Sequence, residues 1–149
     1  MIRKAKIQDI KQMQDLINSF AKKDLMLPRA LNELYENLRD FWVFHQDKKI
    51  VGCCALHISW DDLAEIKSLA VKKNMQRKGI GSQLIVTCIK EAKELGVKKI
   101  FALTYKPEFF RKFGFKRIKY SYLPHKIWAE CINCPKFPNC QEIALVKKL

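Results

Sequence analysis

The sequence lacks any long apolar run. No stretch reaches the roughly 18 apolar residues that a membrane-spanning helix needs. The basic start MIRKAKIQDIKQMQ is not followed by the apolar segment of a secretory signal. Repeats, low-complexity tracts and Gly/Ser linkers are missing as well. For a chain of 149 residues, we therefore expect a single domain, no membrane partner and a cytoplasmic location.

Cysteine is too scarce for a disulfide scaffold. The chain has six cysteines, and in a reducing cytosol they remain thiols. Cys53 and Cys54 lie in an apolar strand, and Cys88 lies on the apolar face of a helix. We expect all three to pack in the core rather than to carry an acyl group.

Acidic residues are also few. Fifteen Asp and Glu stand against 29 Lys and Arg, which gives a net charge of +14. Such an imbalance favours an anionic partner, which could be a nucleic acid, a phosphorylated cofactor or an acidic metabolite. The alternative is a surface charged for solubility. Apolar residues make up 48% of the chain, enough to bury a core.

Hydrophobic periodicity predicts a mixed α/β (α+β) chain: a mainly antiparallel sheet with one helical crossover after its central strand. Asp9 is expected to cap the first helix, and Gly96 to end the third. The expected strands are Met1–Lys6, Phe41–His45, Ile50–Ser59, Leu63–Val71, Lys99–Thr104, Phe115–Tyr120 and Glu142–Val146. The expected helices are Ile10–Phe20, Arg29–Leu38, Ile80–Leu95 and Glu108–Lys112.

The strongest functional signal is the segment that follows Leu69-Ala70-Val71. Four basic residues without an acid lead into Gly79-Ile80-Gly81-Ser82, which opens a helix. A helix N-terminus offers unpaired amides and the positive end of the dipole, and glycines let a phosphate approach the backbone. The pair Gly79-x-Gly81 is too short for a dinucleotide fingerprint and lacks the Gly-Lys-Ser/Thr of a P-loop.

Two motifs resemble a known superfamily. Gln76-x-x-Gly79-x-Gly81 is similar to the acetyl-coenzyme-A motif Q/R-x-x-G-x-G/A of the GNAT N-acetyltransferases. The segment Phe109-Phe110-Arg-Lys-Phe-Gly-Phe115 resembles their second signature, an aromatic helix ending in Gly-Phe. The resemblance spans nearly the whole chain. It implies one GNAT domain over residues 1–149, with a Cys-rich insert at about 123–140, and leaves a homodimer open.

The resemblance also implies how acetyl-CoA, the co-substrate, is bound. Backbone amides from Arg77 to Ser82 would hold the pyrophosphate, with charge from the side chains of Arg77 and Lys78. The backbones of Leu69 and Val71 would pair with the pantetheine arm as an added strand does, and the amide near Leu69 would stabilise the oxyanion. The implied cofactor site comprises Leu69, Ala70, Val71, Gln76, Arg77, Lys78, Gly79, Ile80, Gly81 and Ser82.

Acetyl transfer to an amine needs a base for the amine proton. Glu65 on the central strand is the candidate, since many GNAT enzymes use a Glu there; the alternative is a solvent-facing carboxylate paired with Lys67. Relatives often carry an acid Tyr before the Gly-Phe signature, but this chain has Phe109 and Phe110. Tyr105 is the substitute candidate, unless it only packs at a strand end. A thiolate also leaves without help near neutral pH.

The acceptor is expected to be an anionic amino acid. Leu27-Pro28-Arg29 and the Glu65–Val71 strand resemble small N-acetylglutamate synthase-like proteins of arginine biosynthesis. That resemblance implies L-glutamate, with Arg29 and Lys67 as candidates for its carboxylates. Another amine, such as a protein N-terminus, remains the alternative among acetyltransferases. The positive field disfavours a polyamine.

The Cys-rich insert offers a second interpretation. His125, Cys131, Cys134 and Cys140 are ligand types that suit tetrahedral zinc, but only one C-x-x-C pair is present, so free thiols are favoured. The chemistry itself needs no metal. A nucleic-acid-binding module built on this insert is the alternative outside the enzymes, and it leaves the glycine turn unexplained.

Overall fold

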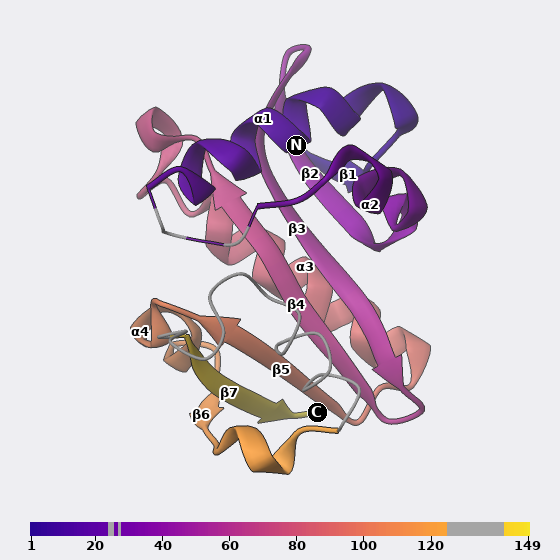
Figure 1. The fold of residues 1–149 in the computed structure, drawn as a ribbon, viewed down its shortest axis with the longest axis vertical. Helices are drawn as coiled ribbons and strands as arrows, with labels where there is room; N and C mark the ends of the chain where they lie inside the picture. The colour runs from indigo at the N-terminus through magenta and orange to yellow at the C-terminus, as the bar shows by residue number, and fades with distance from the viewer. Residues whose placement is uncertain (24–25, 27, 125–141) are drawn as a thin grey trace.

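The computed structural model describes residues 1–149 except 24–25, 27 and 125–141. In these residues, seven strands form one sheet in the order β1-β2-β3-β4-β5-β7-β6 (Figure 1). All neighbouring strands are antiparallel except β4 and β5. The strands are β1 Ile2–Lys4, β2 Phe41–Gln46, β3 Lys49–Trp60, β4 Leu63–Val71, β5 Lys99–Thr104, β6 Lys116–Arg117 and β7 Ile143–Lys148.

The helices cover both faces of the sheet. α1 (Ile10–Ala21) and α2 (Leu31–Glu36) pack on one face of β2–β4, and α3 (Ile80–Leu95) crosses the opposite face (Figure 1). The short α4 (Pro107–Arg111) follows β5. Four 3₁₀ turns complete the described chain: η1 Ile7–Asp9, η2 Leu38–Asp40, η3 Lys73–Met75 and η4 Tyr120–Tyr122. The predicted mixed α/β class and the crossover are confirmed.

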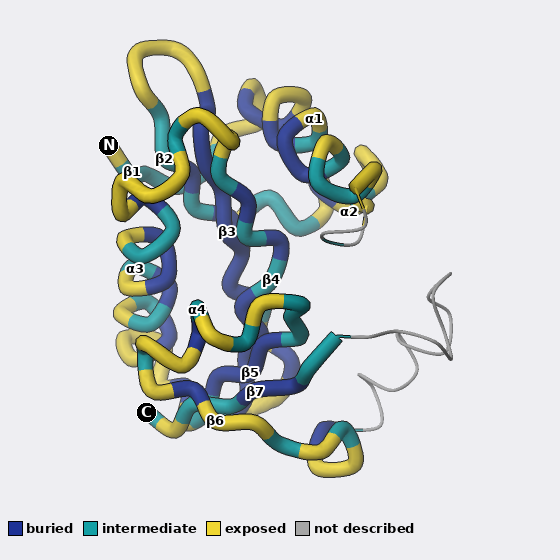
Figure 2. The backbone as a smooth tube through the Cα atoms, turned by 90° about the vertical axis from the view of Figure 1, so that its left-hand side faces the viewer, coloured by how far each residue is buried: buried dark blue, intermediate teal, exposed yellow. Residues whose placement is uncertain are grey.

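α3 joins the two parallel strands and carries the largest apolar face. Its side chains at helical spacing are buried against β3, β4 and β5, while the outer side is exposed (Figure 2). Gly96 ends the helix in the left-handed conformation, with φ 86°, as predicted. The buried residues of α3 are Ile80, Leu84, Ile85, Cys88 and Ala92.

Three sequence expectations were wrong in detail. Asp9 makes no side-chain cap to α1; its carboxylate instead accepts hydrogen bonds from Arg3 Nη1 at 2.6 Å and from the Lys6 amide at 2.8 Å. Burial alone would raise the pKa of Asp9, but these donors lower it. The second helix covers only Leu31–Glu36, because the chain turns into η2 before β2.

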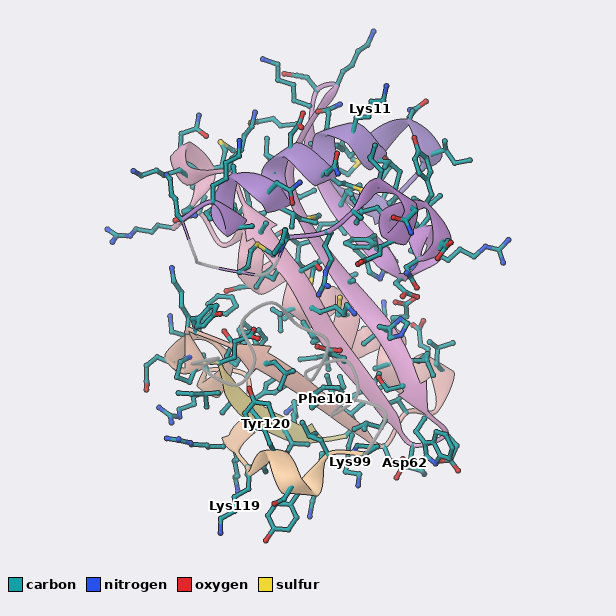
Figure 3. The ribbon with its side chains drawn as sticks, in the orientation of Figure 1. Lys11, Asp62, Lys99, Phe101, Lys119 and Tyr120 are labelled. Atoms are coloured by element: carbon teal, nitrogen blue, oxygen red, sulfur yellow. The ribbon has the colours of Figure 1, made fainter. Side chains whose placement is uncertain are left out.

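The third error concerns the expected strand Phe115–Tyr120. Only Lys116–Arg117 pair with β7, and the chain then enters η4. The reason is local packing: Tyr120 packs against the cluster that contains Phe101, and its hydroxyl donates to the Glu142 carbonyl at 2.8 Å (Figure 3). The Ile118 amide still donates to the Ala144 carbonyl of β7 at 3.0 Å, but the chain then enters η4 and does not extend β6 to Tyr120.

The feature that positions the site is the short pairing between β4 and β5. They share only Leu63–Lys99, Ala64–Ile100 and Glu65–Phe101 as partners, and β4 continues to Val71 without β5 beside it (Figure 1). On its other side, β4 stays paired with β3 as far as Val71. The edge of β4 beyond Glu65 therefore faces a gap in the sheet.

A large-to-small change in α3 should show how far the fold depends on the crossover. Leu84→Ala removes a side chain with no exposed area, so we expect a loss of about 2–5 kcal/mol in the free energy of unfolding. Val86→Ala on the same helix is the matched control, since Val86 is 55% exposed; its change should stay within about 0.5 kcal/mol. Urea denaturation measures both, and equal losses would contradict this assignment of the core face.

Candidate active site

A cavity of about 510 Å³ opens between β4, β5 and the segment before α2. Its volume falls within the range of small-molecule sites. Five cationic side chains and two carboxylates line it: Arg29, Lys67, Arg77, Lys106 and Lys112, and Glu65 and Glu142. This excess of positive charge suits an anionic ligand.

All but one of the predicted site residues line this cavity. Arg29, Lys67 and Glu65 all line it, and Tyr105 follows the last residue of β5. The predicted cofactor residues on the wall are Leu69, Ala70, Val71, Gln76, Arg77, Gly79, Ile80, Gly81 and Ser82. Lys78 is the exception: it is exposed, and its ammonium lies 3.9 Å from the Met75 sulfur.

The turn before α3 has the backbone of an anion site. Arg77 and Gly79 both adopt positive φ, 64° and 81°, and α3 begins immediately after them. This places the unpaired amides of the first helical turn at the cavity wall. Gln76 holds the loop, because its side-chain amide donates to the Val71 carbonyl at 3.0 Å.

Glu65 lies where β4 and β5 part. It is 7% exposed, so the alternative of a solvent-facing carboxylate is wrong. Cross-strand pairing sets Glu65 opposite His57, whose Nδ1 lies 2.6 Å from Asp40 Oδ2. Tyr105 is half-buried and lines the cavity together with Phe109 and Phe110, neither of which can donate a proton.

Arg29 reaches the cavity from the segment that precedes α2. Its backbone amide donates to Asn18 Oδ1 at 3.2 Å, and its Nε donates to Ser68 Oγ at 3.2 Å. A longer ion pair, 3.7 Å, joins its Nη1 to the exposed carboxylate of Glu33. α1 therefore holds the backbone of Arg29, while residues of β4 and α2 hold its guanidinium at the cavity.

Sequence reasoning missed several wall residues. Phe20 and Met26 contribute apolar surface near Arg29, and Phe109 contacts the start of α3. In the sequence, Phe20 belongs to the apolar stripe of the first helix, which predicts a core residue. Only its position near the end of α1 indicates that it could line a cavity. Ser68 was missed because strand alternation places it on the face of α3; no signal in the sequence marks the bulge that turns it toward the cavity.

The buried cysteines behave as expected. Cys53, Cys54 and Cys88 have no exposed area, and burial raises the pKa of Cys53 to about 12. The hydrogen-bonded neighbour Cys88 and burial raise the pKa of Cys54 as well. In the described ranges, no three His, Cys, Asp or Glu side chains gather as a metal site. His125, Cys131, Cys134 and Cys140 lie outside the described residues.

Comparison with known proteins decides the family. The profile of the acetyltransferase (GNAT) family matches residues 7–115. The chain belongs to the GNAT acetyltransferase family. An N-acetyltransferase of Chlorobaculum tepidum, described as uncharacterized, is 38% identical over 99% of this chain and 96% of its own length. An amino-acid acetyltransferase of Mycobacterium tuberculosis is 37% identical over 80% of this chain and 70% of its own length.

A solved structure agrees with this GNAT assignment. N-acetylglutamate synthase from Neisseria gonorrhoeae, complexed with coenzyme A and N-acetyl-glutamate, matches with a TM-score of 0.92 and 27% identity. The match covers all of this chain and 35% of the Neisseria chain. This GNAT protein is thus an enzyme that uses acetyl-CoA as co-substrate. Among its described helices, none has the length and apolar character needed to cross a membrane.

The glycine turn can be tested by adding a charge. A Cβ at Gly81 would lie 3.4 Å from the Phe109 ring, an ordinary contact, and an acid in the first turn of α3 suits the helix dipole. Gly81→Asp should therefore fold, yet weaken acetyl-CoA binding at least tenfold, because like charges about 4 Å apart repel by ~4 kcal/mol near a protein surface. Gly81→Asn is the uncharged control and should bind more tightly than Gly81→Asp. Titration calorimetry measures each Kd, and wild-type affinity in Gly81→Asp would contradict the assignment.

Proposed function

We propose that this enzyme transfers the acetyl group of acetyl-CoA to the α-amine of L-glutamate, as an N-acetylglutamate synthase of arginine biosynthesis. The observation that carries the proposal is the single cavity in which the edge of β4, the Glu65 carboxylate and the Arg29 guanidinium meet. The M. tuberculosis relative is named for amino-acid acetylation, and the Neisseria structure contains N-acetyl-glutamate. Both support an amino-acid acceptor.

Acetyl-CoA would lie along the free edge of β4. The pantetheine arm would pair with the backbones of Leu69 and Val71 as an added strand. The pyrophosphate would meet the amides from Arg77 to Ser82, where the turn has positive φ at Arg77 and Gly79. This arrangement brings the thioester toward Glu65, where β4 and β5 part.

The reaction would be direct attack in a ternary complex. The amine nitrogen bonds to the thioester carbonyl carbon, the amine proton passes to Glu65, directly or through a water, and the C–S bond breaks to release the CoA thiolate. The Leu69 amide would stabilise the oxyanion in between. Tyr105 is the proposed donor to the departing sulfur. Cys53 and Cys54 are not expected to carry the acyl group, since their raised pKa values keep both as thiols at neutral pH.

The acceptor carboxylates would be met by cations on two walls. Arg29 can bind one carboxylate through two parallel N–H donors, and Lys67 lies two residues from Glu65 on the same strand. Because both cations line the same cavity as the base, an acidic amino acid fits better than a cationic amine.

Removing the base should separate chemistry from binding. Glu65→Gln is expected to lower kcat about a hundredfold or more at neutral pH, with little change in acetyl-CoA affinity. Raising the pH should restore part of the rate, because the amine then loses its proton in solution. Glu108→Gln, a change on the exposed face of α4, is the control and should keep wild-type turnover. Wild-type kcat in Glu65→Gln across the pH range would remove Glu65 from the mechanism.

Substrate choice tests the carboxylate assignment. We expect acetylation of L-glutamate and little of L-glutamine, because glutamine keeps the shape and α-carboxylate but leaves a cation unpaired, which costs about 1–3 kcal/mol or more. Arg29→Lys keeps the charge and loses the fork, so the KM for glutamate should rise. Steady-state kinetics of CoA thiol release measures both.

The control is Arg39→Lys, an exposed residue of η2 outside the cavity, which should leave the KM unchanged. If glutamine is acetylated as well as glutamate, the side-chain carboxylate is not read by this site. If neither is acetylated while a peptide N-terminus is, the amino-acid proposal fails and the acetyltransferase assignment remains.

A further inference from the structure

Ser68 has a backbone conformation that a serine rarely adopts. It lies inside β4, yet its φ is 56°, in the left-handed region that favours glycine. The pairing with β3 shows why: Lys67 is opposite Ala55 and Ala70 is opposite Cys53, so two residues of β4 face the single Cys54. This is a β-bulge, and a strained residue at such a place points to a function.

The bulge changes which face of the sheet each side chain meets. Regular alternation would place Ser68 with Ile66, against α3. Instead Ser68 lines the cavity, and the next residue, Leu69, packs against the cluster under α3. The strained φ is thus what presents the Ser68 hydroxyl to the cavity.

The Ser68 hydroxyl is hydrogen-bonded to the side chain of Arg29. Arg29 Nε donates to Ser68 Oγ at 3.2 Å, across 39 residues of sequence. Ser68 is 8% exposed, and the Arg29 side chain is 22% exposed, so water competes little with this bond. The backbone of Arg29 is fixed separately, by Asn18 Oδ1 at its amide and by Gln14 Nε2 at its carbonyl.

We propose that Ser68 is a specificity-determining residue that fixes how Arg29 receives the acceptor carboxylate. With Nε bonded to Ser68, the edge of the guanidinium left for a ligand is the pair Nη1 and Nη2. Nη2 has no hydrogen-bond partner among the described residues, and the Glu33 carboxylate, 3.7 Å from Nη1, is beyond hydrogen-bonding distance. The end of the fork can therefore take a planar carboxylate bidentately. The inference rests on the proposed role of Arg29 in acceptor binding.

A double-mutant cycle tests this coupling. Ser68→Ala should raise the acceptor KM about tenfold, with an unchanged KM for acetyl-CoA and an unchanged pH profile of kcat, because the base is not involved. In an Arg29→Lys background, which has no Nε–H donor, Ser68→Ala should raise the acceptor KM by less than twofold. Ser59→Ala, a change at an equally buried serine on β3 outside the cavity, is the control and should match wild type.

A second variant separates loss of the hydroxyl from backbone strain. Ser68→Gly suits a φ of 56° and lacks the hydroxyl, so it should melt at or above the temperature of Ser68→Ala and show the same rise in acceptor KM. A substrate-free readout is the NMR resonance of the Arg29 Nε–H, which should exchange slowly with water in the wild type and quickly in both variants.

The outcomes are distinct. Equal acceptor KM in wild type and Ser68→Gly, or equal effects of Ser68→Ala in both backgrounds, overturns the role of Ser68 even if L-glutamate is the substrate. Failure of the wild-type enzyme to acetylate any amino acid overturns the proposed function, and it is seen before any variant is made.

Discussion

The site depends on one constraint, the parting of two parallel strands. β4 and β5 share three residue pairs and then separate, while β4 stays tied to β3. A parallel pair requires a crossover, and α3 supplies it. The buried face of α3 packs against both strands, on the face of the sheet opposite α1 and α2. The strand edge left open and the start of the crossover helix therefore lie at one cavity, where an extended, anionic cofactor would find backbone partners and helix amides together.

The second layer of the arrangement is the bulge at Ser68. It reverses the alternation within β4, so that Glu65 and Lys67 face the cavity while Leu69 and Val71 pack toward α3. The reversal leaves the backbone of Leu69 and Val71 at the cavity and releases the Ser68 hydroxyl toward Arg29. The proposed cofactor and acceptor contacts would thus lie along one strand, which also carries the Glu65 carboxylate.

The crossover unit was predictable from the sequence because its signals are local. The period changes from two to 3.6 at the glycine turn, and Gly96 marks the end of α3, so β4 and α3 were predicted with the bounds that the structure has. The bulge was not, since the apolar pattern of β4 continues through it. The contact between Arg29 and Ser68 joins residues far apart in sequence, and the short β6 results from packing of Tyr120, so neither follows from local pattern.

The measurement that most directly tests this account is a crystal structure with a bisubstrate analogue in which the CoA sulfur is linked to the α-nitrogen of glutamate. The account predicts the pantetheine arm along Leu69 and Val71, the pyrophosphate at the amides from Arg77 to Ser82, the linked nitrogen near Glu65, and a carboxylate on the Nη pair of Arg29. A glutamate group bound away from Arg29, or a nitrogen beyond the reach of Glu65 and one bridging water, would contradict it.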